Sequence, residues 1–175
     1  METGTRLSRV ITSCALVAFG CSAFALEPAA AAPDGLDVFV GAWSCAGHFT
    51  ANNRPISAHL SISRDAATNA LIVRHDDDPP LGYHALEIWS ATKPGTLRAS
   101  ISDAFSGMRW FGADGWNGST LTWRRPAEGA VEEQFRYVLD PAGGFRVDWS
   151  TARKDGTLAI GDTIACQKSG SSTAG

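Results

Sequence analysis

Apolar and polar residues alternate in short stretches along most of the chain after residue 40. Between residues 56 and 63 every second position is apolar and the intervening positions are polar, the apolar set being Ile56, Ala58, Leu60 and Ile62. Alternation with a period of two is typical of a β-strand with one buried face. No window of 12 or more residues sustains a helical period, and we expect at most a short helical turn over residues 35–40.

Ten strands are expected from this pattern. Turn-forming Gly, Pro and Asp residues separate them, as in Lys93-Pro94-Gly95 and Lys154-Asp155-Gly156. Many short strands at regular spacing predict an all-β sandwich or an up-and-down barrel. The expected strands cover 41–50, 56–63, 70–74, 83–89, 96–102, 107–113, 119–124, 131–139, 144–151 and 158–167.

The first 25 residues have the pattern of a secretory signal peptide. Arg6 and Arg9 precede the apolar run Val10–Phe19, and Ser22–Ala25 ends in an Ala-x-Ala cleavage pattern. The run is too short to predict a membrane span, and no later segment approaches 18 apolar residues. We therefore expect a periplasmic or secreted protein without an integral membrane span.

The expected organisation has three further parts. Residues 26–35 are rich in Ala and Pro and read as a tether, residues 36–168 as the barrel domain and residues 169–175 as a flexible tail. Cleavage within 29–32 is an alternative. A degenerate lipoprotein pattern that ends at Cys21 leaves a lipid anchor as a second, less favoured, alternative.

Two cysteines remain after the leader, Cys45 and Cys166, and they fall in the first and last expected strands. An even pair in an exported chain most simply forms a disulfide, which requires Cα atoms within about 7 Å. A meander of hairpins whose ends meet is a closed barrel without free edges. The fold prediction is therefore an all-β, closed antiparallel up-and-down barrel of eight to ten strands, with a sandwich as the alternative.

Composition narrows the function classes. The chain has 15 basic and 18 acidic side chains, a net charge of −3, so it lacks the basic excess that a nucleic-acid partner requires. Its 44% hydrophobic and 19% charged residues are typical of a globular protein rather than a disordered one.

All six tryptophans follow the leader, and strand alternation suggests which face of each strand they occupy. Trp110 shares a face with Met108, and Phe135 with Glu133 and Tyr137, whereas Arg109 falls on the face opposite Trp110. We expect an apolar, aromatic interior that either forms a pocket or is filled by its own side chains. The predicted ligand-binding residues are Trp43, Tyr83, His84, Trp89, Arg109, Trp110, Trp123, Phe135 and Trp149, with Tyr83, His84 or Arg109 orienting a polar end.

Glu87 shares a face with Tyr83 and Trp89, and His84 lies on the other face of that strand. Periodicity does not say which face is interior. If the Trp89 face is interior, Glu87 is a buried acid and a site candidate. If it is exterior, which is the commoner situation for a glutamate, Glu87 is a solvated surface residue.

Chemical motifs are few. The segment His75–Pro80 concentrates three aspartates beside a histidine, but it lacks a calcium-loop pattern and reads as a rigid loop at the barrel mouth. The sequence has no Gly-x-Ser-x-Gly elbow and no glycine-rich phosphate loop. We assign no catalytic residue, no metal ligand and no cofactor.

Several short motifs resemble one protein family. Gly41-Ala42-Trp43 is similar to the Gly-x-Trp signature of lipocalins and the wider calycin group. Further segments resemble the uncharacterised exported lipocalin-like proteins of bacteria, the domain-of-unknown-function 1579 type. These segments are Pro79-Pro80-x-x-Tyr83-His84, Asp103-x-x-x-Gly107, Gly115-Trp116-Asn117-Gly118 with Leu121-Thr122-Trp123, and Asp162-Thr163-x-x-Cys166.

This resemblance spans about residues 36–168 and implies a calycin-like barrel in which Trp43 packs across the closed end. It also implies an apolar ligand such as a lipid, quinone or pigment. A related barrel, nitrobindin, binds haem through a histidine near its C-terminus, but residues 121–167 contain no histidine here. His48 or His84 would have to substitute.

The expected function is reversible binding of a small apolar or aromatic molecule inside the barrel. The alternatives are a filled barrel that acts as a structural or interaction module of the cell envelope, and an enzyme acting on a small apolar substrate.

Overall fold

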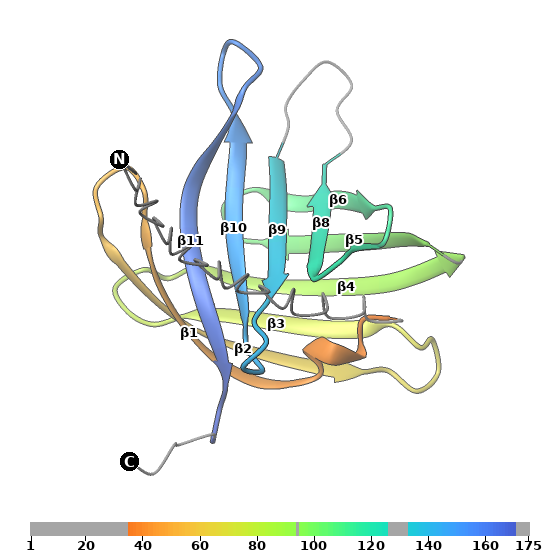
Figure 1. Ribbon diagram of the computed structural model, residues 1–175. Helices are drawn as coiled ribbons and strands as arrows, with labels where there is room; N and C mark the ends of the chain where they lie inside the picture. Colours follow the sequence, from red (N-terminus) through yellow and green to blue (C-terminus); the bar gives the residue numbers. More distant parts are fainter. Residues whose placement is uncertain (1–34, 94, 126–132, 171–175) are drawn as a thin grey trace, which may run out of the picture.

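The computed structural model describes residues 35–93, 95–125 and 133–170, and its strands curl into one closed sheet (Figure 1). The signal peptide expected over 1–25 lies outside the described residues, as do nearly all of the tether and most of the tail. Within the described ranges, no helix has the length and apolar character needed to cross a membrane.

The ten expected strands are all present, and the structure adds one very short strand, β7. A single turn of 3₁₀-helix, η1 (Asp37–Phe39), precedes them. The strands are β1 (Gly41–Phe49), β2 (Pro55–Arg64), β3 (Leu71–Asp77), β4 (His84–Lys93), β5 (Thr96–Asp103), β6 (Gly107–Ala113), β7 (Trp116–Asn117), β8 (Thr120–Arg124), β9 (Glu133–Leu139), β10 (Phe145–Ala152) and β11 (Leu158–Lys168).

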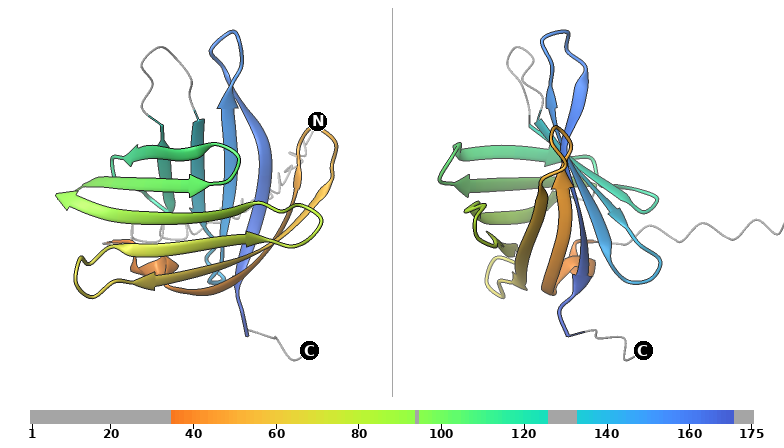
Figure 2. Two further views of the ribbon diagram at one scale, coloured as in Figure 1. Left: turned by 180° about the vertical axis from the view of Figure 1, so that it is seen from behind. Right: turned by 90° about the vertical axis from the view of Figure 1, so that its left-hand side faces the viewer.

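The strands form an up-and-down barrel, which confirms the predicted fold class. Strands that follow one another in the sequence pair antiparallel, and β1 pairs with β11. The ring closes where β6 pairs with β8 through Gly112 and Arg124, so that ten strands form the wall and β7 is an appendage of β8. Figure 2 shows the curled sheet from behind and from the side.

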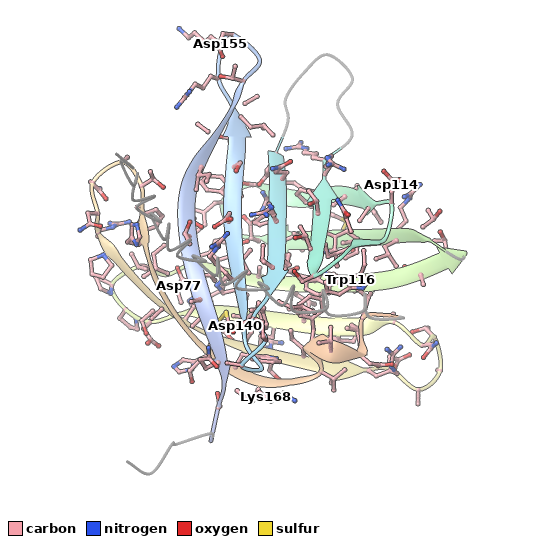
Figure 3. All side chains as sticks on the ribbon, in the orientation of Figure 1. Asp77, Asp114, Trp116, Asp140, Asp155 and Lys168 are labelled. Carbon is pink, nitrogen blue, oxygen red and sulfur yellow. A yellow bond between two sulfur atoms is a disulfide. The ribbon has the colours of Figure 1, made fainter. Side chains whose placement is uncertain are left out.

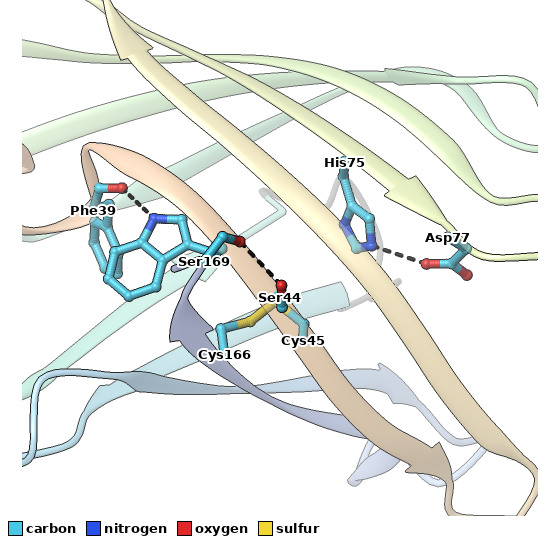
Figure 4. Close-up of a disulfide and its surroundings, with 8 residues drawn as sticks. Phe39, Ser44, Cys45, His75, Asp77, Cys166 and Ser169 are labelled. Carbon is cyan, nitrogen blue, oxygen red and sulfur yellow. Dashed lines mark hydrogen bonds and ion pairs between the residues drawn. A yellow bond between two sulfur atoms is a disulfide. The ribbon is translucent and has the colours of Figure 1, made fainter. Parts of the chain in front are cut away.

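A disulfide joins the first and last strands, as predicted. Cys45 lies directly opposite Cys166 in the register of β1 and β11, with Cα atoms 4.0 Å apart. Figure 4 shows the bond between the two strands, beside a hydrogen bond of 3.0 Å between the hydroxyls of Ser44 and Ser169. The seam between the two ends of the chain is therefore closed both by the strand ladder and covalently.

An aromatic cluster fills the end of the barrel at η1. Phe39 is fully buried, and the indole of Trp43 donates a 2.7 Å hydrogen bond to its carbonyl oxygen (Figure 4). Buried aromatic pairs in such edge and stacked geometries stabilise a core beyond their area. The ring centroids that lie 5.2–5.6 Å from Phe39 are those of Trp89, Trp116, Tyr137 and Phe145.

Strand faces confirm some predictions and overturn one. Ile56, Ala58, Leu60 and Ile62 are all buried, as the alternation predicts. The interior placement of Met108 and Trp110 is wrong, because both side chains are 62% exposed on the outer face of β6. Phe111 and Ala113 pack inside instead, and Arg109 points inward because two carboxylates receive it there.

The outer face of β4, β5 and β6 carries an apolar patch. Ile88 lies in register with Ser100 and Trp110, and Leu86 with Ser102 and Met108. The four apolar side chains of these two rows are between 44% and 62% exposed. Grouped exposure of this kind is less common than single exposed apolar residues.

Candidate functional site

A cavity of about 410 Å³ occupies the barrel interior away from η1. This volume falls within the range of about 300–1,000 Å³ that is typical of small-molecule sites. Its walls include side chains near the β1–β2, β3–β4 and β5–β6 connections, so it lies toward the end of the barrel opposite the aromatic cluster. The aromatic and aliphatic lining includes Phe49, Leu60, Tyr83, Phe135, Tyr137 and Trp149.

Tyr137 forms the boundary between the aromatic cluster and the cavity. Its ring packs against Phe39 and Trp89 with centroid distances of 5.4 Å, and the same side chain lines the cavity. Burial, reinforced by the nearby Glu87 and Tyr83, holds the pKa of the Tyr137 phenol well above its ordinary value. The phenol is therefore a neutral hydrogen-bond donor and acceptor.

A buried ion-pair cluster forms one wall. The guanidinium of Arg109 donates to Asp103 through one terminal nitrogen and to Glu133 through the other. All three side chains are buried, and Asp103 also accepts backbone N–H bonds of 2.8 and 2.6 Å from Phe105 and Ser106. A buried charge is tolerated only with such partners.

The pKa values in this cluster follow from these contacts. Burial acts to raise the pKa of Asp103, but the two backbone N–H bonds and Arg109 outweigh it and lower the pKa. Burial acts to lower the pKa of Arg109, but Glu133 and Asp103 outweigh it and raise the pKa. The charged forms of both residues are therefore favoured.

Glu133 also fixes the indole of Trp149. The Trp149 Nε1–H donates a 3.0 Å hydrogen bond to the Glu133 oxygen that accepts from Arg109. Across the sheet, a β-bulge places Gly161 against this ring, where an added Cβ would lie 2.5 Å from a ring carbon. A glycine at this bulge is thus what allows Trp149 to lie flat against β11 and line the cavity.

Glu87 is a buried cavity residue, the less favoured of the two placements that the sequence left open. It is 5% exposed, and its Oε2 accepts a 2.8 Å hydrogen bond from the indole of Trp89. Burial raises its pKa, whereas His75, the Trp89 hydrogen bond and Arg109 act to lower it. Burial is the largest of these effects, so Glu87 holds its proton to higher pH than a solvated glutamate.

Three more titratable groups line the cavity nearer its mouth. His75 Nε2 and Asp77 Oδ1 are 3.0 Å apart (Figure 4). Asp162, within β11, has a pKa raised to about 6 by burial, with Asp77 and Asp148 adding to this and His75 opposing it. The described residues hold no group of three or more His, Cys, Asp or Glu side chains that could bind a metal ion.

The nine predicted ligand-binding residues fall into three groups. Tyr83, Arg109, Phe135 and Trp149 line the cavity. Trp43, Trp89 and Trp123 are buried but belong to the packed core. The side chains of His84 and Trp110 lie on the outside of the barrel, and each is more than 60% exposed. His84 Nδ1 is 2.9 Å from Asp76 Oδ1 there.

Apart from Glu87, which it left as one of two alternatives, the sequence analysis did not identify the acidic residues that line the cavity or pair with Arg109. It placed Glu133 on the same face as Phe135 and Tyr137, and an acid on an otherwise apolar strand face is a signal of a buried partner. Asp103 gave no comparable signal, because it ends β5, where a solvated aspartate is common. Asp162 lies inside β11, in a stretch where polar residues occur on both faces.

The fold and the site together define a closed antiparallel β-barrel with an internal cavity that is aromatic in its walls and acidic in its polar groups. Comparison of the sequence with protein-family models and with curated proteins finds no match.

Proposed function

We propose that this protein binds a small molecule with an apolar or aromatic body inside the barrel. The observation that carries the proposal is the cavity of about 410 Å³ behind a sealed aromatic end. A barrel that served only as a structural module would fill this space with its own side chains, because protein interiors are close-packed. The cavity therefore favours ligand binding over the filled-barrel alternative.

The lining can supply the binding energy. A ligand that loses 200–300 Å² of apolar surface to the cavity gains roughly 5–7 kcal/mol at about 25 cal/mol per Å², before the cost of association. Tyr83, Phe135 and Trp149 provide flat apolar faces, and the Glu133 hydrogen bond holds Trp149 in place. A preformed site of this kind lowers the ordering cost of binding.

The setting of this function is proposed to be the periplasm or the cell exterior. The Cys45–Cys166 disulfide supports an oxidising compartment. The pattern of a signal peptide over residues 1–25 and the resemblance to exported lipocalin-like proteins point the same way.

The test is titration with Nile red, an uncharged fluorophore, in wild type and two valine variants. Val147 is buried in the cavity wall on β10, whereas Val138 lies on the outer face of β9. We expect wild type to bind with a micromolar Kd, Val147→Phe to weaken binding at least tenfold because the ring occupies the cavity, and Val138→Phe to leave it unchanged.

Thermal denaturation of both variants checks that they fold. Absence of fluorescence enhancement in folded wild type, or equal affinity in Val147→Phe and wild type, would contradict a ligand site in this cavity.

A further inference from the structure

We propose that the ligand is an organic cation, with an amine as its polar end and an aromatic or alkyl body. This proposal rests on the proposed binding function and adds the charge of the ligand. Four features of the cavity support it: the excess of acidic groups, the engagement of Arg109 by protein carboxylates, the unpaired oxygen of Glu87 and the aromatic walls.

The charges around the cavity are unbalanced. Among the described lining residues, four are carboxylic acids and three are basic. The acids are Asp77, Glu87, Glu133 and Asp162, and the bases are Arg54, His75 and Arg109. Asp103 adds another carboxylate behind Arg109. An anion that enters a partly desolvated cavity of this composition meets repulsion, and a cation meets attraction.

Arg109 is already engaged by protein carboxylates. Its two terminal nitrogens donate to Asp103 and Glu133, so the cluster of three has a net charge of −1. Arg125, 42% exposed, lies 3.6 Å from the other Glu133 oxygen and offsets part of this charge from the solvent side. The Nε of Arg109 is the one nitrogen of its side chain that has no partner within the described part of the chain, and it is sealed from solvent. A ligand carboxylate therefore finds no free guanidinium at this depth.

The second arginine lies at the rim. Arg54 is exposed and stacks over the ring of Phe49, with its guanidinium carbon 4.7 Å from the ring centroid. An ion pair between Arg54 and a ligand anion would be in contact with water and would contribute little to the binding free energy. The deep part of the cavity is thus acidic, and the positive charge at its mouth is screened.

A carboxyl oxygen is open to the cavity. Glu87 is 5% exposed and lines the cavity, and its Oε2 accepts from Trp89. Its Oε1 has no hydrogen-bond partner in the described ranges, although it is not sealed off like Arg109 Nε. A buried carboxyl with one unpaired oxygen facing a cavity is a receptor for a hydrogen-bond donor.

The aromatic walls suit the same ligand. Faces of Tyr, Phe and Trp attract cations, by about 2 kcal/mol when the site is desolvated. Tyr83, Phe135, Tyr137 and Trp149 surround the volume that Glu87 faces. An aromatic cavity with an acid in its wall is a common way to recognise an amine, which needs both a counter-charge and apolar contact.

An amine beside Glu87 would also act on its ionisation. Burial raises the pKa of Glu87, and an ammonium group beside it favours the ionised form. Binding of an amine would therefore lower this pKa. The groups that also act on Glu87 are His75 and Arg109, which favour ionisation, and Asp103, which opposes it.

The experiment compares three probes with one body and three head groups by isothermal titration calorimetry at pH 7. The probes are 2-(2-naphthyl)ethylamine, 2-(2-naphthyl)ethanol and 3-(2-naphthyl)propanoate. We expect the amine to bind at least tenfold more tightly than the alcohol, and the carboxylate to bind more weakly than the alcohol. Carboxylate binding as tight as that of the amine would overturn the cation proposal and leave the proposed function standing.

Failure of all three probes in a protein that binds Nile red would likewise overturn the cation proposal alone. Failure of the naphthyl probes and of Nile red would overturn the proposed function as well.

Two matched acid-to-amide variants locate the effect. Glu87→Gln keeps an oxygen that can accept from Trp89, whereas Asp114→Asn makes the same chemical replacement at an exposed position outside this cavity (Figure 3). We expect Glu87→Gln to weaken amine binding at least tenfold and to change alcohol binding less than threefold. Equal effects of Glu87→Gln and Asp114→Asn on amine binding would refute a contact with Glu87.

Discussion

Asp162 is a single acid whose burial makes the stability of the whole barrel depend on pH. Its pKa rises from 3.8 to about 6, chiefly because of burial. The folded state therefore holds this proton to higher pH than the unfolded state, and the free energy of unfolding falls as the pH rises from about 4 to 6. Above this window the penalty of the buried charge stays constant.

Asp162→Asn removes that penalty, because an amide is neutral at every pH. We expect the variant to be more stable than wild type by about 1–2 kcal/mol at pH 7. This is less than the full pKa shift would give at about 1.4 kcal/mol per unit, because water at the mouth screens the charge. Urea denaturation at pH 4 and pH 7 measures the difference, which should be smaller at pH 4. An equal gain at both values would contradict the raised pKa.

Asp155→Asn is the control of opposite sign. The hydroxyl and backbone N–H of Thr157 lower the pKa of Asp155, which lies exposed at the tip of the β10–β11 hairpin (Figure 3). A lowered pKa contributes stability that is present above the unfolded pKa and is lost as the pH falls through the folded value. At pH 7, Asp155→Asn should therefore be less stable than wild type, and this difference should shrink in acid. Asp162→Asn should instead be more stable than wild type at pH 7.

The Arg109 cluster makes a second prediction at this scale. Arg109→Met removes the buried counter-charge of Asp103 and Glu133 and leaves only the partly exposed Arg125, 3.6 Å from Glu133. We therefore expect a loss of about 3–5 kcal/mol in the free energy of unfolding. The triple variant Asp103→Asn, Arg109→Met, Glu133→Gln removes all three charges and should regain most of this loss. A loss below about 1 kcal/mol in Arg109→Met, measured by chemical denaturation, would show that the cluster is not held as described.

At the scale of the strand, the bulge in β11 sets the position of a cavity wall. Gly161→Ala places a Cβ within 2.5 Å of the Trp149 ring, so the ring must shift and its hydrogen bond to Glu133 must weaken. We expect a loss of about 1–3 kcal/mol in stability, typical of overpacking, together with weaker binding of Nile red. Both follow from one displaced side chain.

Gly35→Ala is the matched control, because a Cβ at Gly35 meets nothing within 4 Å and its φ is not in the left-handed region. It should leave stability and Nile red affinity unchanged. Equal Nile red affinity in Gly161→Ala and wild type would show that Trp149 does not shape the ligand site.

Strands also show how far the sequence carries a prediction. Between Ile56 and Ser63 of β2 every inward residue is apolar and every outward residue is polar, so the alternation predicts the interior face correctly. In β6 both faces carry large side chains, and the usual preference of arginine for water predicts the wrong face. Arg109 points inward because Asp103 on the neighbouring strand β5 and Glu133 on β9 receive it there, and no local pattern reveals a partner supplied by another strand.

The same limit applies to β4, where Glu87 and Trp89 share the interior face with Tyr83. Period-two alternation identifies residues that lie together, but both faces of β4 carry apolar residues, since Leu86 and Ile88 occupy the outer one. The fold was predictable because it depends on strand number and turn positions. The acidic part of the cavity was not predictable, because it depends on ion pairs and hydrogen bonds between side chains of different strands.

At the scale of the whole molecule, the disulfide constrains the unfolded chain more than the folded one. The two cysteines are 121 residues apart, and closing a loop of that size corresponds to about 4–5 kcal/mol at most in the chain-entropy model. We expect Cys45→Ala with Cys166→Ala to lose about 2–5 kcal/mol while keeping the barrel, because β1 and β11 remain hydrogen-bonded.

Urea denaturation of the double variant and of reduced wild type measures this loss, and the two values should agree. A loss below about 1 kcal/mol in both would show that the bond adds little to the strand ladder at the seam.

The position of that bond has a mechanical consequence. A force applied between the two ends of the chain acts on β1 and β11 and then reaches Cys45 and Cys166, which carry the load through a covalent bond. The chain between them, which spans a sequence separation of 121 or roughly 400 Å at about 3.4 Å per residue, is shielded from the pull. Under tension the oxidised barrel can unfold only in the segments before Cys45 and after Cys166. Reduction of the disulfide allows the chain between the two cysteines to extend as well.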